Sequence, residues 1–194
     1  MELYLVRHTA PVAAAGLCYG QSEVDADPAE TLAAAARLRT LLPAAAPLFS
    51  SPSRRCRVLA EALAAAPRFD ERLREMHFGQ WEMQPWSAIP HAQLDAWQAD
   101  LLGFAPPGGE SAAALYRRAG AFLRDLPGTA EAAVIVAHAG VLRALAGHLL
   151  ALPAAEWTAL GFEFGSASLI KRGGPGAALV WHNRRSRVID MIDI

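Results

Sequence analysis

The sequence predicts an α/β protein in which a mostly parallel sheet lies between two layers of helices. Two short, continuously apolar segments, 3–6 and 132–137, have the pattern of buried parallel strands. Segments with helical periodicity alternate with strands along the chain, and this order is typical of a three-layer α/β/α sandwich. The 194 residues are 53% hydrophobic, which is enough apolar surface for one domain over residues 1–194 to bury its own core.

Helix and turn signals place the other elements. We expect Ser51 to cap a helix that starts at Pro52. Residues 28–42 form another expected helix, with Leu32, Leu38 and Leu41 on its inner face. Further helices are expected over 88–102, 111–126 and 141–152, and further strands over 47–50, 69–74, 167–171 and 177–183. The last two strands either pair as a hairpin or lie against the sheet.

Composition argues against several classes of function. The formal net charge is −1, so no whole-chain field selects nucleic acid or an anionic membrane, and we expect neither as a partner. No apolar stretch approaches the roughly 18–20 residues of a membrane span, and the start of the chain lacks a secretory signal pattern. Cys18 and Cys56 fit neither a metal-ligand spacing nor a disulfide framework. Two free thiols indicate a reducing, cytoplasmic location.

The first strand delivers two polar residues, Arg7 and His8, to its carboxyl end. In open α/β sheets, ligands bind at the carboxyl ends of the strands. A guanidinium group matches the geometry of phosphate and stays charged, and a neutral imidazole can attack phosphorus near neutral pH. Taken alone, such a pair is more often structural, so this interpretation depends on partners elsewhere in the chain.

Arg55 is the first such partner. Four apolar residues form one arc of the helix after Ser51, namely Val58, Leu59, Ala62 and Leu63. At 100° per residue, Arg55 points to within about 10° of the centre of that arc. A charge in a buried stripe is costly unless it is paired. An anion held over the sheet edge explains the placement of Arg55, and an internal ion pair is an equal alternative.

His138 repeats the arrangement found at His8, because the strand 132–137 ends at this histidine and a helix follows. The carboxyl ends of parallel strands meet at one edge of the sheet, so we expect His138 to lie beside His8, Arg7 and Arg55. Two guanidinium groups and two imidazoles at one edge predict a phosphate site. They stabilise the charge of a phosphoryl group without a metal, and we expect no cofactor.

With these residues, the chain resembles the histidine phosphatase superfamily, the phosphoglycerate-mutase-like proteins. Four blocks carry the resemblance in order across residues 3–145: LVRHT, SSPSRRC, REMHFGQWE and VAHAGVLRAL. The sequence PPGGES between the third and fourth blocks is also typical of the family. The resemblance implies a phosphatase that works through a phosphohistidine intermediate.

Carried over by position, the resemblance implies roles for five residues. His8 would be the nucleophile that takes the phosphoryl group, while Arg7, Arg55 and His138 would hold the phosphate oxygens. Glu75 matches the general acid of the family. Glu82, in the same block, is the alternative candidate for that acid.

The chemistry of phosphoryl transfer is consistent with these roles. Its catalysis is mostly positioning and electrostatic stabilisation, and a histidine nucleophile splits hydrolysis into two steps. An alkoxide leaving group needs an acid, which can later activate water. Nearby arginines favour the ionised form of Glu75 and bound phosphate favours its protonated form. We therefore expect the acid form of Glu75 only when substrate is bound.

The loop after His8 indicates which branch of the superfamily the chain resembles. The similarity is to the α-ribazole phosphatase branch: the stretch LVRHTAPVAAAGLCYGQSEVD matches it closely as far as CYGQ and less closely after that. By position in that branch, Tyr19 and Gly20 would line the substrate site, although an ordinary loop aromatic is an equal alternative for Tyr19. Pro11 and Ala14 stand where many histidine phosphatases have a polar residue and an asparagine. This difference argues against a phosphoglycerate mutase.

We therefore expect a metal-independent phosphomonoesterase that acts on a small phosphorylated substrate, with α-ribazole 5′-phosphate of cobalamin biosynthesis as the specific choice. The alternatives are a broad-specificity phosphatase, a phosphoglycerate-mutase-like enzyme and a catalytically dead phosphate-binding protein. Residues 76–111 have no strand pattern, and we expect them to form a small lobe inserted over the active site.

Overall fold

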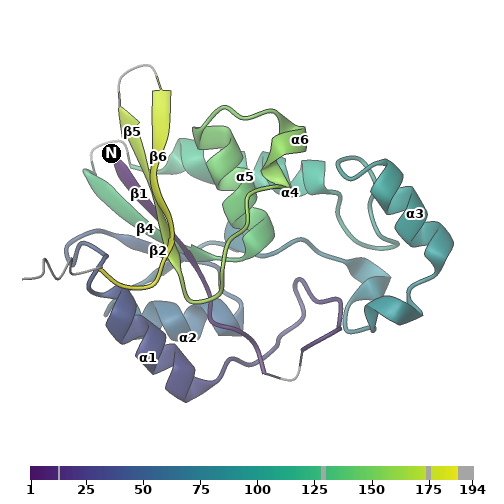
Figure 1. Cartoon of the computed structure of the whole chain (residues 1–194), viewed down its shortest axis with the longest axis horizontal. Helices are drawn as coiled ribbons and strands as arrows, with labels where there is room; N and C mark the ends of the chain where they lie inside the picture. The colour runs from purple at the N-terminus through teal and green to yellow at the C-terminus, as the bar shows by residue number, and fades with distance from the viewer. Residues whose placement is uncertain (13, 128–129, 174–175, 188–194) are drawn as a thin grey trace, which may run out of the picture.

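The computed structural model describes residues 1–12, 14–127, 130–173 and 176–187. Within them, six strands form one sheet in the order β3-β2-β4-β1-β5-β6. The strands are β1 Glu2–Arg7, β2 Leu48–Ser50, β3 Arg68–Phe69, β4 Ala132–Ala137, β5 Ala167–Gly173 and β6 Gly176–Arg184. The first four run parallel, and β5 and β6 add an antiparallel hairpin at one edge (Figure 1). The mostly parallel sheet is confirmed.

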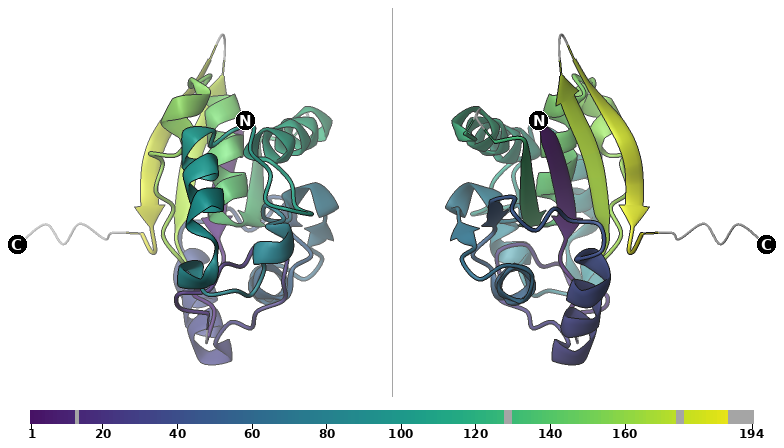
Figure 2. Two further views of the ribbon diagram at one scale, coloured as in Figure 1. Left: turned by 90° about the vertical axis from the view of Figure 1, so that its right-hand side faces the viewer. Right: turned by 90° about the vertical axis from the view of Figure 1, so that its left-hand side faces the viewer.

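Helices cover both faces of this sheet (Figures 1 and 2). Helices α1 Pro28–Leu38 and α2 Arg54–Leu63 lie on one face, and α4 Ala112–Asp125, α5 Ala139–Leu149 and the short α6 Ala154–Trp157 lie on the other, while α3 His91–Ala99 stands apart from the sheet. Successive side chains of a strand point to opposite faces, so Leu5 and Ile135 pack with α4 and α5, whereas Val6 and Val136 pack with α1 and α2. The predicted three-layer α/β/α sandwich is confirmed.

Helix α1 shows how small side chains set a buried face. Its buried residues are Thr31, Ala34, Ala35 and Leu38, which recur at helical spacing. Leu32 was expected on this face but is 64% exposed. The expectation was wrong because alanine and threonine, rather than the first leucine, define the side that approaches α2 and the sheet.

Helix α2 begins at Arg54, two residues later than predicted, and Ser51 is not its cap. The N–H of Ser51 donates to the carbonyl of Val136 at 3.0 Å, which extends the pairing of β2 with β4 by one residue and delays the helix. Glu23 from the preceding loop supplies the missing cap, because its carboxylate accepts from the N–H of Arg54 at 2.7 Å.

The third predicted strand, 69–74, is also shorter than expected. Strand β3 covers only Arg68–Phe69, and Glu71–Leu73 form a 3₁₀ turn, η1. The carboxylate of Asp70 accepts from the N–H of Arg72 at 2.9 Å, and this local bond competes with strand pairing.

Residues 76–111, the lobe expected over the active site, contain α3 and the 3₁₀ turns η2 Gly79–Trp81 and η3 Trp86–Ala88. In Figure 1 this segment stands apart from the sheet. It has a core of its own in which Trp81 and Ile89 pack with Cys18 from the loop after β1. No helix in the described part of the chain is long and apolar enough to cross a membrane.

Candidate active site

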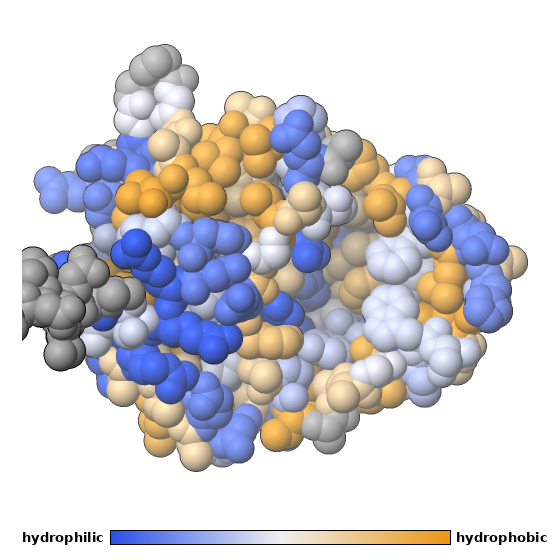
Figure 3. Space-filling model, in the orientation of Figure 1, coloured by the Kyte–Doolittle hydropathy of each residue, from blue (hydrophilic) through white to orange (hydrophobic). Residues whose placement is uncertain are grey.

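A cavity of about 280 Å³ opens where β1 and β4 end. Arg7 and His8 line it from the end of β1, Arg55 from the first turn of α2, and His138 from the end of β4. Glu75 completes this set of polar groups. Figure 3 shows the corresponding face of the molecule hollowed between the body that holds the sheet and the lobe. Side chains from four distant parts of the sequence therefore surround one cavity.

His8 is held as a neutral base. Its side chain is 2% exposed, and its Nδ1 lies 2.7 Å from the carbonyl oxygen of Thr9. Because a carbonyl can only accept, Nδ1 carries the hydrogen and Nε2 carries the lone pair. Burial, followed by the charge of Arg55, holds the pKa of His8 well below its usual range. The imidazole is therefore a competent nucleophile without first losing a proton.

His138 occupies the position before the first residue of α5, and its ring centroid lies 5.1 Å from that of His8. Its Nε2 is 2.9 Å from the hydroxyl oxygen of Ser51 and 3.5 Å from the sulfur of Cys56. Burial and then the charge of Arg55 hold the pKa of His138 well below its usual range. The serine that was expected to cap α2 thus orients an imidazole of the site instead.

Arg7 is partly buried and Arg55 is fully buried, and neither has an acidic partner among the described residues. Among the described residues, neither guanidinium group lies within 4.0 Å of a carboxylate. Arg7 donates to the carbonyl of Phe162 at 2.5 Å and stacks on the ring of Phe164. Burial lowers its pKa. Within the part of the chain that the structure describes, Arg55 therefore lacks the internal ion pair that periodicity had left open.

Arg55 is fully buried and is fixed by backbone carbonyls. Its Nη1 donates to the carbonyl of Ser22 at 3.0 Å, and its Nη2 donates to that of Gly20 at 2.6 Å. Two bonds to rigid backbone fix the plane of the guanidinium group. The side chain keeps its charge at the cavity wall because neither bond neutralises it.

Glu75 lies at the N-terminus of α5. Its Oε2 accepts from the N–H of Gly140 at 3.0 Å, and its Oε1 accepts from the N–H of Met76 at 2.9 Å. A carboxylate is favoured at this end of a helix. A Cβ atom on Gly140 would lie 2.4 Å from Oε1, so only glycine lets the carboxylate approach so closely.

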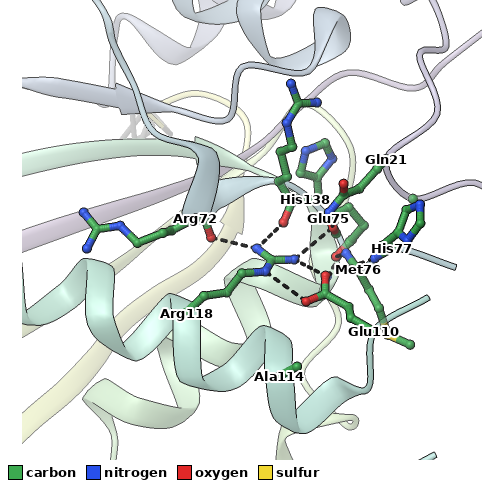
Figure 4. Close-up of polar contacts among 12 residues, drawn as sticks. Gln21, Arg72, Glu75, Met76, His77, Glu110, Ala114, Arg118 and His138 are labelled. Atoms are coloured by element: carbon green, nitrogen blue, oxygen red, sulfur yellow. Dashed lines mark hydrogen bonds and ion pairs between the residues drawn. The ribbon is translucent and has the colours of Figure 1, made fainter. Parts of the chain in front are cut away.

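Arg118 of α4 fixes the backbone that carries Glu75 (Figure 4). It donates to the carbonyls of Arg72, Arg74 and Glu75 at 2.7, 2.5 and 2.9 Å. Its charge is balanced by Glu110, whose carboxylate lies 2.5 Å from Nη2. One arginine thus binds three carbonyls within residues 72–75, which places Glu75 beside the cavity.

Glu82 has a different environment from Glu75 and does not line the cavity. Its carboxylate accepts from four backbone N–H groups at 2.9–3.1 Å, those of Gly20, Gln21, Ser22 and Phe78. Burial alone would raise the pKa of Glu82, but these bonds outweigh it and lower the pKa. Glu75 also accepts from two backbone N–H groups, but it lines the cavity and Glu82 does not, so the geometry favours Glu75 as the acid.

The two residues expected at the substrate site lie in different places. Tyr19 lines the cavity, and its ring lies 5.4 Å from the guanidinium carbon of Arg55. Gly20 does not line it. A Cβ atom on Gly20 would lie 1.8 Å from the carbonyl oxygen of Met76, so close packing requires the glycine. Direct contact of either residue with substrate stays a prediction.

A sequence profile of the histidine phosphatase superfamily (branch 1) matches residues 3–185. The chain belongs to the histidine phosphatase superfamily. The resemblance drawn from the four sequence blocks is therefore confirmed. The fold agrees, since the crystal structure of the alpha-ribazole phosphatase from Shigella flexneri superposes with a TM-score of 0.86 at 27% identity and covers 96% of this chain and 98% of that one.

The similar proteins within the superfamily are named for more than one substrate. The glucosyl-3-phosphoglycerate phosphatase of Mycobacterium tuberculosis is 34% identical over 134 residues, which is 60% of this chain and 57% of that protein. The adenosylcobalamin/alpha-ribazole phosphatase of Salmonella typhimurium is 36% identical over 89 residues, 43% of this chain and 44% of that protein. The chain thus spans about half the length of these curated relatives.

Sequence reasoning missed several residues around this histidine phosphatase cavity. Leu17, Phe78 and Trp86 form apolar parts of its wall, and Arg143 of α5 adds a further cation. Arg143 donates from Nε to the carbonyl of Leu160 at 2.8 Å. A detectable signal existed, because Arg143 lies one helical turn after Ala139 and so shares the face that begins beside His138.

A second cavity, of about 210 Å³, borders the first and shares Glu75, Phe78 and Arg143 with it. The rest of its wall is mainly apolar and includes Met76, Trp97, Leu101, Leu115 and Tyr116. The two cavities together provide a charged pocket next to an apolar one. Among the described residues, no group of three or more His, Cys, Asp or Glu side chains is arranged to hold a metal ion.

Proposed function

We propose that this chain is a phosphomonoesterase that hydrolyses its substrate through a phosphohistidine intermediate. The observation that carries the proposal is a pair of guanidinium groups, the partly buried Arg7 and the fully buried Arg55, that line the cavity with the neutral His8 and have no acidic partner among the described residues. Buried cations are costly unless an opposite charge joins them. A phosphate dianion in the cavity provides that charge next to the nucleophile.

The proposed reaction has two steps. Nε2 of His8 attacks phosphorus, the ester P–O bond breaks, and Glu75 donates its proton to the leaving oxygen. Arg7, Arg55 and His138 stabilise the charge on the phosphoryl oxygens throughout. In the second step Glu75 accepts a proton from water, the resulting P–O bond replaces the P–N bond, and inorganic phosphate leaves. His8 returns to its neutral form.

We propose α-ribazole 5′-phosphate as the substrate. Its leaving group joins a ribose to a flat, uncharged heteroaromatic base. The second cavity suits such a group, because Trp97, Leu101 and Tyr116 offer apolar and aromatic surface beside Glu75. The names of the Salmonella and Shigella relatives agree with this choice. The free thiols of Cys18 and Cys56 support the cytoplasm as its compartment.

The test is a comparison of kcat/KM over phosphomonoesters with chelator present. The set contains α-ribazole 5′-phosphate, glucosyl-3-phosphoglycerate, phosphoserine, 3-phosphoglycerate and p-nitrophenyl phosphate. We expect turnover of all aryl and alkyl esters that fit the cavity, with the highest kcat/KM for α-ribazole 5′-phosphate. We expect no turnover by His8→Ala. Equal kcat/KM values would indicate a broad-specificity phosphatase. Full activity of His8→Ala contradicts the nucleophile, and absence of turnover in the wild type identifies a phosphate-binding protein.

A further inference from the structure

We propose that Glu82 is a positioning residue that holds Arg55 in its phosphate-binding geometry through the loop 20–22. This inference rests on the proposed role of Arg55 in binding phosphate. The loop lies between the two side chains. Its N–H groups donate to Glu82, and its carbonyls accept from Arg55.

One peptide unit connects the two charges directly. The carbonyl of Gly20 accepts from Nη2 of Arg55 at 2.6 Å, and the N–H of Gln21, in the same peptide plane, donates to Oε1 of Glu82 at 3.0 Å. The dipole of this peptide therefore points its negative end at the guanidinium group and its positive end at the carboxylate. Hydrogen bonds arranged in series in this way polarise and strengthen one another.

This arrangement solves an electrostatic problem of the site. A carboxylate in contact with Arg55 would stabilise the buried cation but would also compete with phosphate for it. Glu82 supplies the negative charge one peptide away, where it stabilises Arg55 without occupying the cavity. The guanidinium group therefore keeps an open side for an anionic ligand.

The loop lies close against Glu82 and Phe78, with no room for a side chain at Gly20. A Cβ atom on Gly20 would lie 3.0 Å from Oε1 of Glu82 and 2.7 Å from the ring of Phe78. The chain just before this loop is joined to the lobe by backbone bonds, since the N–H of Met83 donates to the carbonyl of Cys18 at 2.7 Å and the N–H of Cys18 donates to that of Gln84 at 2.8 Å. The lobe therefore also helps to fix the position of Arg55 at the phosphate site.

Glu82→Gln and Glu82→Asp test the inference, with Asp27→Asn as the matched control. Asp27 also accepts two backbone N–H groups, but at the start of α1 and away from the cavity. The measurements are the competitive inhibition constant of inorganic phosphate and kcat/KM for p-nitrophenyl phosphate and for an alkyl phosphate. Thermal unfolding is followed for every variant, and assays are run below the lowest midpoint.

We expect Glu82→Gln to weaken phosphate inhibition about tenfold, the equivalent of one lost charge-assisted hydrogen bond. The kcat/KM of Glu82→Gln should fall by the same factor for both esters, because both bind through their phosphate group. Glu82→Asp, which keeps the charge, should recover part of the affinity. Asp27→Asn should lose stability and keep its phosphate affinity.

Two results overturn the inference while the proposed function stands. One is an active wild type whose phosphate affinity is unchanged in both Glu82 variants. The other is a loss in Glu82→Gln that is confined to the alkyl ester, which would make Glu82 the acid. A wild type that neither binds phosphate nor turns over an ester refutes the proposed function itself, and the role of Glu82 falls with it.

Discussion

Replacing Glu75 by glutamine tests the step in which the leaving group is protonated. The amide keeps the size of the side chain, but it has one acceptor oxygen where Glu75 uses two, for Gly140 and Met76. One of these N–H groups then faces an NH₂ group, and we expect a stability loss of about 1–3 kcal/mol. The catalytic loss should be larger for esters that need an acid, about 10²–10⁴-fold in kcat/KM. This corresponds to about 3–5 kcal/mol.

The leaving group separates this effect from a general loss of binding. Nitrophenolate leaves without a proton, so kcat/KM for p-nitrophenyl phosphate should fall less than about tenfold in Glu75→Gln. The value of kcat should fall for both esters, because the second step also needs Glu75 as a base. A burst of nitrophenolate, one per enzyme, should therefore precede slow turnover. Equal losses in kcat/KM for the two esters, or full retention of activity, would refute the role of Glu75.

Three further predictions follow from other parts of the molecule. Arg118→Met removes the donor to three carbonyls and leaves Glu110 unpaired, so the free energy of unfolding should fall by about 2–4 kcal/mol in urea titrations; an unchanged midpoint contradicts this role. Leu101 lies in the wall of the second cavity and is 43% exposed. Leu101→Ser should lower kcat/KM for α-ribazole 5′-phosphate about fivefold and leave kcat/KM for glycerol phosphate unchanged. Equal losses for both substrates would mean that the heteroaromatic base binds elsewhere. The lowered pKa values of His8 and His138 mean that the unfolded chain binds more protons below about pH 6.5. Stability should thus be complete above that pH and decrease as pH falls toward the folded-state pKa values, with a smaller decrease in His8→Ala; the same decrease in both proteins contradicts this assignment.

Much of the fold could be predicted because it depends on short-range patterns. A continuous apolar run defines a central parallel strand, and the residues that follow it must lie at the carboxyl edge of the sheet. This geometry places Arg7, His8 and His138. The position of Arg55 follows from the fixed 100° step of a helix, even though one residue of its predicted arc, Val58, was misplaced. Val58 is 37% exposed, while Cys56 and Ala60 are buried.

The sequence by itself therefore determined which residues reach the edge of the sheet. Only the tertiary structure decided what each does there, because those roles depend on contacts between segments distant in the chain. Ser51 and Glu82 illustrate this. A serine before a helix and a glutamate after a tryptophan carry no signal that one will orient His138 and the other will hold the loop behind Arg55. Hydrogen bonds of this kind have no period in the sequence, and they form only once packing has brought the backbone of one segment against the side chain of another.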